Sequence, residues 1–240
     1  MAAAQEAFMR RVVHDLRAPL RHVTSYGVLV RELLDELQPA PEPVQEALEC
    51  VQTMERSARR MALMLDGLRA LADAERAALH CAPVDLGAAV QQARAQLAAR
   101  EAGRAVQWQV AGDLPAVRAD AALLVQLLRE LLDNALKFTR GRAPAHIAVQ
   151  AQAMPGQRVL IRVQDDGVGF DPERAGQILG VFERLHREGE FEGVGAGLAL
   201  CSAIARRHGA TLHVSARPGA GCTVELDWPA APDPAPAGTA

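Results

Sequence analysis

Two apolar seams separated by prolines constrain the N-terminal part of the chain. Each seam repeats hydrophobic or small residues at steps that alternate between four and three, the spacing of a heptad. The first seam consists of Met9, Val13, Leu16, Leu20, Val23, Gly27, Val30, Leu34 and Leu37. The second consists of Ala47, Val51, Met54, Ala58, Met61, Leu65, Leu68 and Ala72. Because the segment 38–43 between them contains three prolines, it must interrupt the helix, and the pattern predicts an antiparallel helical hairpin.

A hairpin on its own buries two seams poorly, so we expect residues 1–80 to form a homodimer with a four-helix bundle. The alternative is a monomeric hairpin that packs on the rest of the chain. Pro19 lies inside the first helix and is expected to bend it. His14 follows the seam residue Val13, so we expect it to lie off the seam and face outward. Taken alone, it would be interpreted as an ordinary surface histidine.

The composition argues against several classes of protein. A formal net charge of −3 is unfavourable for binding nucleic acid, which needs a basic face. No apolar run approaches the roughly 18–20 residues that cross a bilayer, so no direct membrane insertion is expected. The chain does not open on a signal peptide, and we therefore expect a cytoplasmic protein. The four cysteines form no CxxC pair and are expected to be reduced.

A second domain is predicted over residues 84–229, where the helical pattern gives way to mixed elements. Asp85 and Asp120 are candidate N-caps for helices that end near Arg100 and Phe138. A third helix is predicted at 196–208, and strands are predicted at 106–110, 147–153, 158–164, 211–216 and 221–228. This order predicts an α+β chain whose second domain has a mixed sheet with helices on one face. Residues 230–240 are rich in alanine and proline and are expected to form a disordered tail.

Glu130, Asn134 and Lys137 recur at helical spacing on one face of the predicted second helix. An amide oxygen is a suitable ligand for Mg²⁺, and an ammonium group can contact a phosphate. The alternative is a charged face in contact with solvent.

Two glycine-rich segments follow. Asp165-Asp166-Gly167-Val168-Gly169 comes after a predicted strand, where the glycines permit a tight turn and the carboxylate can accept a hydrogen bond from an exocyclic amine. Gly193-Val194-Gly195-Ala196-Gly197-Leu198 leads into a helix whose first amide groups favour anions. The second segment lacks the Lys-Ser/Thr of a P-loop and the glycine spacing of a dinucleotide-binding fingerprint.

With the segment Val13-His14-Asp15-Leu16-Arg17-Ala18-Pro19-Leu20 upstream, these motifs resemble those of the catalytic core of two-component sensor histidine kinases, in the type with a phytochrome-linked H box. The resemblance extends from about Phe8 to Trp228. The motifs keep the family order: H box at His14, N box around Asn134, G1 box at Asp165, an F-box-like Val181-Phe182-Glu183-Arg184, and G2 box at Gly193.

The resemblance implies a dimerisation and phosphotransfer hairpin followed by a Bergerat-type (GHKL) α/β sandwich that binds ATP with Mg²⁺. His14 matches the phosphoacceptor and Asp15 its acidic neighbour. Asn134 matches the Mg²⁺ ligand, with Glu130 as a second candidate ligand. The remaining nucleotide-binding positions are Lys137 for phosphate, Asp165, Gly167 and Gly169 for adenine, and Gly193, Gly195, Gly197 and Leu198 beside an ATP lid at about 184–194. The implied activity is autophosphorylation of His14 and transfer to an aspartate of a response regulator receiver domain.

Three positions depart from the family pattern. Glu130 stands where asparagine is frequent and could serve as a base, as in related ATPases. Asp166 replaces a common asparagine. Ala18 replaces a threonine or asparagine that helps to dephosphorylate the regulator, which puts that activity in doubt. The alternatives are therefore a degenerate kinase that acts as a nucleotide-binding scaffold, and a GHKL-type ATPase.

Because few residues precede His14, the signal is expected from a separate sensor protein or from a missing N-terminal sensor domain.

Overall fold

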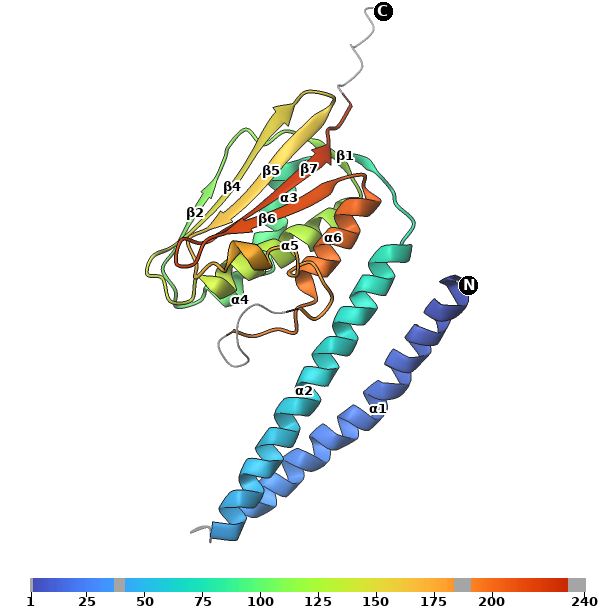
Figure 1. Ribbon diagram of the computed structural model, residues 1–240, viewed down its shortest axis with the longest axis vertical. Helices are drawn as coiled ribbons and strands as arrows, with labels where there is room; N and C mark the ends of the chain where they lie inside the picture. Colours follow the sequence, from blue (N-terminus) through green and yellow to red (C-terminus); the bar gives the residue numbers. More distant parts are fainter. Residues whose placement is uncertain (1, 37–41, 184–190, 233–240) are drawn as a thin grey trace, which may run out of the picture. The chain divides into compact units, whose positions relative to one another are not determined.

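The computed structural model describes residues 2–36, 42–183 and 191–232 and contains two compact units, Met1–Ala72 and Asp73–Ala240 (Figure 1). The first unit consists of helix α1, Ala2–Asp35, and most of helix α2, Glu42–Arg76. Helix α1 continues through Pro19 as a single helical element. Most of the predicted proline-rich connection, residues 37–41, lies outside the described residues. No helix in the described ranges is long and apolar enough to span a bilayer.

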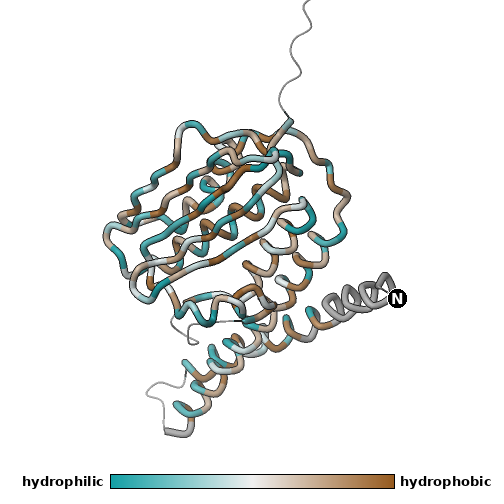
Figure 2. The backbone as a smooth tube through the Cα atoms, turned by 45° about the horizontal axis from the view of Figure 1, so that its top comes forward, coloured by the Kyte–Doolittle hydropathy of each residue, from teal (hydrophilic) through white to brown (hydrophobic). Residues whose placement is uncertain are grey.

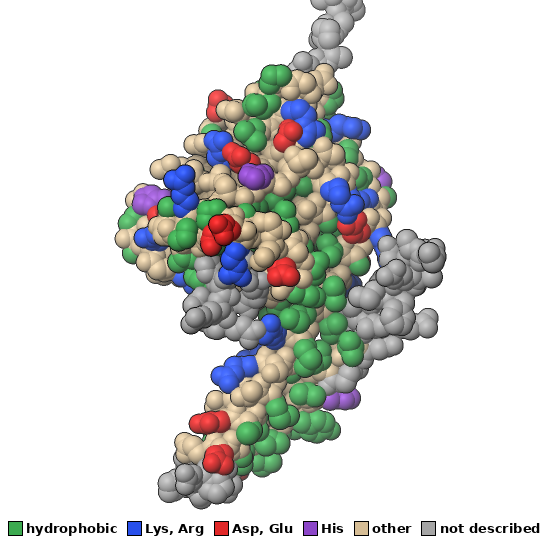
Figure 3. All heavy atoms as spheres, in the orientation of Figure 1, with side chains coloured by type: hydrophobic (Ala, Val, Ile, Leu, Met, Phe, Trp, Pro, Cys, Tyr) green, Lys and Arg blue, Asp and Glu red, His purple; other side chains and the backbone are tan. Residues whose placement is uncertain are grey.

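Each seam of the hairpin consists of the first and the fourth position of every heptad, and in the structure the first position is more buried than the fourth. In α2, the first position of each heptad is buried at Val51, Ala58 and Leu65, whereas the fourth position is exposed at Met54 and Met61. In α1, Leu20, Gly27 and Leu34 are buried or half-buried, whereas Leu16, Val23 and Val30 are exposed. Hydrophobic side chains accordingly gather on the surface of the hairpin (Figure 3). One hairpin therefore covers half of each seam.

The weak seam position at Gly27 has a structural reason. Glu55 is buried against it, and a Cβ atom at Gly27 would lie 3.2 Å from the Glu55 Cγ atom. The Glu55 carboxylate accepts hydrogen bonds from Arg31 Nε at 3.4 Å and from Arg59 Nη2 at 3.1 Å. A glycine at this position leaves the room that the paired carboxylate needs between the helices, because a buried charge must keep its partners.

The second unit is built on a five-stranded mixed sheet in the order β2-β4-β5-β7-β6. Strands β2 and β4 are parallel, and every other neighbouring pair is antiparallel. The strands of this sheet are β2 Val106–Val110, β4 Ala145–Met154, β5 Arg158–Asp165, β6 Thr211–Ala216 and β7 Cys222–Pro229. Hydrophobic and hydrophilic residues alternate along these strands (Figure 2), as expected for a sheet with one buried face.

Helices cover one face of this sheet, as predicted (Figure 1). They are α3 Leu86–Ala95, α4 Ala98–Glu101, α5 Ala121–Phe138 and α6 Gly197–Arg207, with a 3-10 turn, η1, at Pro172–Arg174. Helix α5 contacts α3, α6 and the sheet, and its leucines form the centre of the core. The core is closed by Trp228, which is fully buried and donates a hydrogen bond from Nε1 to the Arg118 carbonyl at 3.1 Å.

Three expectations from sequence need correction. The helix predicted to run to about Arg100 ends at Ala95, and α4 follows as a separate short helix. A two-stranded sheet of β1 Ala82–Val84 and β3 Val117–Ala119 was not predicted, because three-residue strands carry too little periodicity. The start of the predicted disordered tail is ordered, since Ala230 forms a β-bridge with Val117; residues 233–240 lie outside the described part.

The N-cap of α5 links the start of this helix to the segment at His80 and generates a stability prediction. The Asp120 carboxylate accepts hydrogen bonds from the N–H groups of Ala122, Leu123 and His80. Replacement of Asp120 with alanine should lower the free energy of unfolding by about 1–2 kcal/mol, because these donors lose their acceptor. Asparagine should retain most of the cap. Urea unfolding at neutral pH measures both variants, and equal losses for alanine and asparagine would contradict this role.

Candidate functional site

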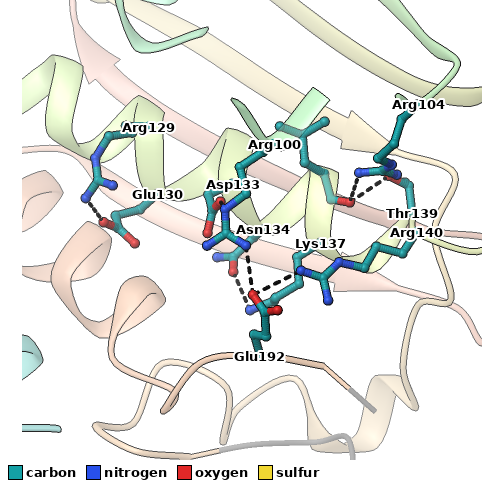
Figure 4. Close-up of polar contacts among 11 residues, drawn as sticks. Arg100, Arg104, Arg129, Glu130, Asp133, Asn134, Lys137, Thr139, Arg140 and Glu192 are labelled. Atoms are coloured by element: carbon teal, nitrogen blue, oxygen red, sulfur yellow. Dashed lines mark hydrogen bonds and ion pairs between the residues drawn. The ribbon is translucent and has the colours of Figure 1, made fainter. Parts of the chain in front are cut away.

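The polar edge of α5 carries an amide and an ammonium group in direct contact. Lys137 Nζ donates a hydrogen bond to Asn134 Oδ1 at 3.0 Å (Figure 4). The same ammonium group lies 4.4 Å from the centroid of the Phe138 ring. Asn134 and Lys137 are three residues apart, which places both on one helical stripe while the leucines of α5 face the core. The structure therefore brings this predicted pair together.

Glu130 lies one turn before Asn134 and is paired with its neighbour Arg129 (Figure 4). Burial raises the pKa of Glu130 above its usual value, although the Arg129 guanidinium opposes this shift. The carboxylate also reaches the start of α6, because a Cβ atom at Gly197 would lie 2.9 Å from Glu130 Oε2 and 3.8 Å from Asn134 Nδ2. A side chain at Gly197 would therefore collide with the Glu130 carboxylate.

The start of α6 suits an anion. Its N-cap, Ala196, offers no side-chain hydrogen bond to the first amide groups of the helix, and Leu198 in the first turn is half-buried. Gly193 has a φ of 107°. Gly195 has a φ of 79° and accepts a hydrogen bond from the Phe182 N–H at 3.0 Å. A helix start with unsatisfied N–H groups and a favourable dipole attracts negative charge.

Asp165 ends β5 as a mostly buried carboxylate, with 9% of its surface exposed. Its Oδ1 atom accepts a hydrogen bond from the Gly167 N–H at 2.9 Å. Burial raises the pKa of Asp165 to about 6; the hydrogen bonds from the Gly167 and Cys222 backbones oppose the shift, and the charge of Asp166 adds to it. A buried carboxylate with spare acceptor capacity is suited to a neutral hydrogen-bond donor such as an amine of a base.

The turn after Asp165 is packed so closely that glycine is required. Gly169 has a φ of 59°, and a Cβ atom there would lie 2.0 Å from the Arg217 carbonyl oxygen. Gly167 approaches the end of α5, since its Cβ would lie 2.6 Å from the Phe138 carbonyl oxygen. Sequence reasoning missed Gly221, whose Cβ would lie 1.9 Å from the Asp165 carbonyl oxygen. The sequence indicates a turn at Pro218–Gly221, but it does not indicate that Gly221 contacts Asp165.

Arg142 is a second residue that sequence reasoning missed. Its guanidinium donates hydrogen bonds to the backbone carbonyls of Asp166 at 2.8 Å, Gly167 at 3.4 Å and Gly219 at 2.7 Å. Beside it, the Asp166 carboxylate accepts a hydrogen bond from the His146 N–H and lies 2.9 Å from the His146 ring nitrogen Nδ1. Arg142 therefore joins the Asp165–Gly169 turn to the β6–β7 turn.

The described part of the second unit brings most of the predicted nucleotide-binding residues around α5. Gly193 lies beside Lys137, with a Cβ position 3.6 Å from Nζ, and the Val168 N–H donates a hydrogen bond to the Phe138 carbonyl at 3.2 Å. His14 and Asp15 belong to α1 in the other unit, and their side chains, like that of Ala18, lie outside the described residues. Arg184 and lid residues 184–190 also lie outside them.

The donor set along α5 fits Mg²⁺. The Asn134 side-chain amide and the Glu130 carboxylate lie one helical turn apart, and both carry oxygen atoms of the kind that Mg²⁺ prefers. Mg²⁺ typically takes one or two protein oxygens and completes its shell with water and phosphate. Among the described residues, no group of three or more His, Cys, Asp or Glu side chains could hold a metal ion by itself.

Comparisons with known proteins agree with this geometry. Residues 119–232 match the family model described as histidine kinase-, DNA gyrase B-, and HSP90-like ATPase. The chain is 31% identical over 219 residues to cyanobacterial phytochrome A of Nostoc sp., covering 90% of this chain and 27% of that protein. It is 29% identical over 218 residues to the alginate biosynthesis sensor protein KinB of Pseudomonas aeruginosa, covering 89% of this chain and 35% of that protein. The chain thus spans about a third or less of the length of these relatives.

Solved structures have the same fold. The structure of full-length ShkA in complex with AMPPNP is 26% identical, with a TM-score of 0.64 over 94% of this chain and 46% of that chain. The mycobacterial sensor histidine kinase MprB, 21% identical, has a TM-score of 0.55 and covers 63% of this chain and 99% of that one. Residues 119–232 therefore belong to the histidine kinase-, DNA gyrase B-, and HSP90-like ATPase family, and the chain as a whole is similar to the catalytic core of sensor histidine kinases.

Proposed function

We propose that this chain is an ATP-dependent protein-histidine kinase that phosphorylates its own His14 and passes the phosphoryl group to an aspartate of a response regulator receiver domain. One observation carries the proposal: the Asn134–Lys137 pair, the start of α6 and the turn after Asp165 all meet along α5. An edge suited to phosphate and a carboxylate suited to an amine are thereby both held next to one helix. The AMPPNP complex of the related ShkA structure supports ATP as the nucleotide.

The nucleotide lies along α5 in this proposal. Asp165 accepts a hydrogen bond from the exocyclic amine of adenine, because its carboxylate is buried at the end of β5. Lys137 and the first N–H groups of α6 bind the phosphates. Asn134 and Glu130 hold Mg²⁺, which neutralises phosphate charge when bound.

The chemical step is an in-line phosphoryl transfer. A ring nitrogen of His14 forms a bond to the γ-phosphorus while the bond from that phosphorus to the bridging oxygen breaks, and its electron pair leaves with ADP. Asp15 accepts a hydrogen bond from the other ring nitrogen, which raises the basicity of the attacking nitrogen. Residues 1–80 supply this phosphoacceptor as the dimerisation and phosphotransfer hairpin, and residues 84–229 supply the nucleotide.

Autophosphorylation is tested with γ-labelled ATP and Mg²⁺. We expect acid-labile label on the unmodified chain, none on His14→Ala, and a rate lower by on the order of 100-fold for Asn134→Ala. His22→Ala is the matched control, because His22 is an exposed histidine of the same helix, and it should be labelled normally.

Three results would contradict the kinase proposal. Label that persists on His14→Ala would show that His14 is not the phosphoacceptor. Release of free phosphate without labelled protein would indicate a GHKL-type ATPase. Bound ATP with neither label nor hydrolysis would indicate a nucleotide-binding scaffold.

Adenosine binding should depend on pH through Asp165. The carboxylate is the binding form, and its pKa is raised to about 6, so affinity should be full above about pH 7 and fall as pH drops through 6, approaching about tenfold per pH unit. Adenosine is the appropriate probe, because phosphates themselves titrate near pH 6. Calorimetric titration should give a flat, weaker profile for Asp165→Asn.

The neighbouring titratable pair provides the control for this profile. His146 and Asp166 lie in contact with one another beside the same turn. His146→Gln should leave the pH profile of adenosine binding unchanged. If the pH profile flattened in His146→Gln and persisted in Asp165→Asn, the pH dependence would arise from the His146–Asp166 pair, and the role of Asp165 would be contradicted.

Dimerisation is tested on the exposed half of the seam. Met61 is 46% exposed on the fourth heptad position of α2, which would lie inside a four-helix bundle. Met61→Glu should weaken association by at least about tenfold, because a charge would be buried. Leu63→Glu is the control, since Leu63 is similarly exposed but lies off the seam. Sedimentation equilibrium measures both; equal association of Met61→Glu and the unmodified chain would overturn the bundle.

A further inference from the structure

Glu192, which directly precedes Gly193, is held by two arginines from different segments. Arg100 at α4 donates a hydrogen bond from Nη1 to Glu192 Oε2 at 2.9 Å. Arg140, just beyond the end of α5, approaches the same oxygen with Nη2 at 3.0 Å. Figure 4 shows both guanidinium groups directed at this one carboxylate. The contact draws together residues that lie far apart in the sequence.

This cluster adjoins the Asn134–Lys137 pair. The backbone that follows Glu192 passes within van der Waals distance of the ammonium group, since a Cβ atom at Gly193 would lie 3.6 Å from Lys137 Nζ. The preceding residue, Phe191, packs its ring against Phe138 with centroids 5.0 Å apart. Glu192 is therefore fixed on both sides to the C-terminal end of α5.

Among the described residues, both cationic and acidic side chains contribute to this cluster. Two guanidinium groups and the Lys137 ammonium converge on this end of α5. Asp133 pairs with Arg100 Nε at 3.1 Å, and Glu192 supplies the second carboxylate. Hydrogen bonds from Arg140 and Arg100 hold the pKa of Glu192 below its usual value, so it is ionised at neutral pH.

A carboxylate bound by two guanidinium groups marks a place where a phosphate can also bind, since arginine presents the same fork of donors to either group. We propose that Arg100 and Arg140 form an additional binding site for the terminal phosphates of the nucleotide, and that the Glu192 carboxylate competes with those phosphates for the two arginines. The site rests on the proposed nucleotide binding along α5. Neither arginine belongs to the motifs that identified the family.

The competition should have a modest size. Arg100, Arg140 and Glu192 have 43%, 40% and 64% of their side chains exposed, and ion pairs that are so exposed change an equilibrium by about two- to fivefold. Glu192→Gln should therefore raise the affinity for ATP about two- to fivefold at low salt. Arg140→Gln should lower it by a similar factor. Both effects should shrink at high salt because exposed charges are screened.

The experiment compares adenosine, AMP, ADP and a non-hydrolysable ATP analogue by calorimetric titration of the full chain with Mg²⁺. The effect of Glu192→Gln should be absent for adenosine and grow as phosphates are added. In the double variant Arg100→Gln with Arg140→Gln, a further Glu192→Gln change should have no effect, because the carboxylate then has no arginine for which to compete.

A matched control removes a comparable exposed ion pair elsewhere. Asp227 pairs with Arg158 at 2.8 Å, at the end of β5 opposite Asp165, and Asp227→Asn should leave every affinity unchanged. Unchanged or weaker ATP binding by Glu192→Gln, with adenosine binding intact, would overturn the inference. Failure of the unmodified chain to bind adenosine or ATP would instead overturn the proposed function, so the two failures are distinguishable.

Discussion

Burial of the leucine-rich face of α5 against the sheet is the interaction on which the ATPase domain depends. Leu124, Leu127, Leu128 and Leu132 are fully buried, and Leu131 and Leu136 nearly so. Burial of each such side chain contributes about 1.5–3 kcal/mol. Because the apolar face fixes the rotation of the helix, the opposite stripe with Glu130, Asn134 and Lys137 has one possible orientation. The core thereby sets the geometry of the candidate site.

The same helix also joins the two halves of the site at its C-terminal end. The Phe138 carbonyl accepts a hydrogen bond from the turn that follows Asp165. The Phe138 ring packs against Phe191, which lies shortly before Gly193. The turn that follows Asp165 and the Asn134–Lys137 pair therefore contact α5 within about one helical turn of each other. Loss of packing along α5 would disturb both at once, whereas the proposed phosphoacceptor lies in a unit with its own core.

Structural features that are set by residues close together in the sequence could be predicted from the sequence. The cap at Asp120, the end of α5 at Phe138 and the bounds of β2 and β6 all follow from local sequence signals, and the structure confirms them. Arg142, Gly221 and the arginines around Glu192 escaped prediction because their partners lie between about 24 and 92 residues away. A lone arginine or glycine has no pattern of its own, so its role becomes visible only once the strands have been brought together. The side chains of His14 and Asp15 lie outside the described residues, and their assignment stays a prediction.

Arg142 has a consequence for how this site can change. Its three acceptors are main-chain carbonyls, at Asp166, Gly167 and Gly219, so the contact does not depend on which side chains those positions carry. Asp166 can therefore be exchanged for a neutral residue without loss of this connection between the two turns. The charge next to the Asp165 carboxylate is in this way uncoupled from the backbone contacts of Arg142. If Asp165 binds adenine as we propose, substitution of Asp166 would alter the affinity for nucleotide and its pH range while the backbone stays in place.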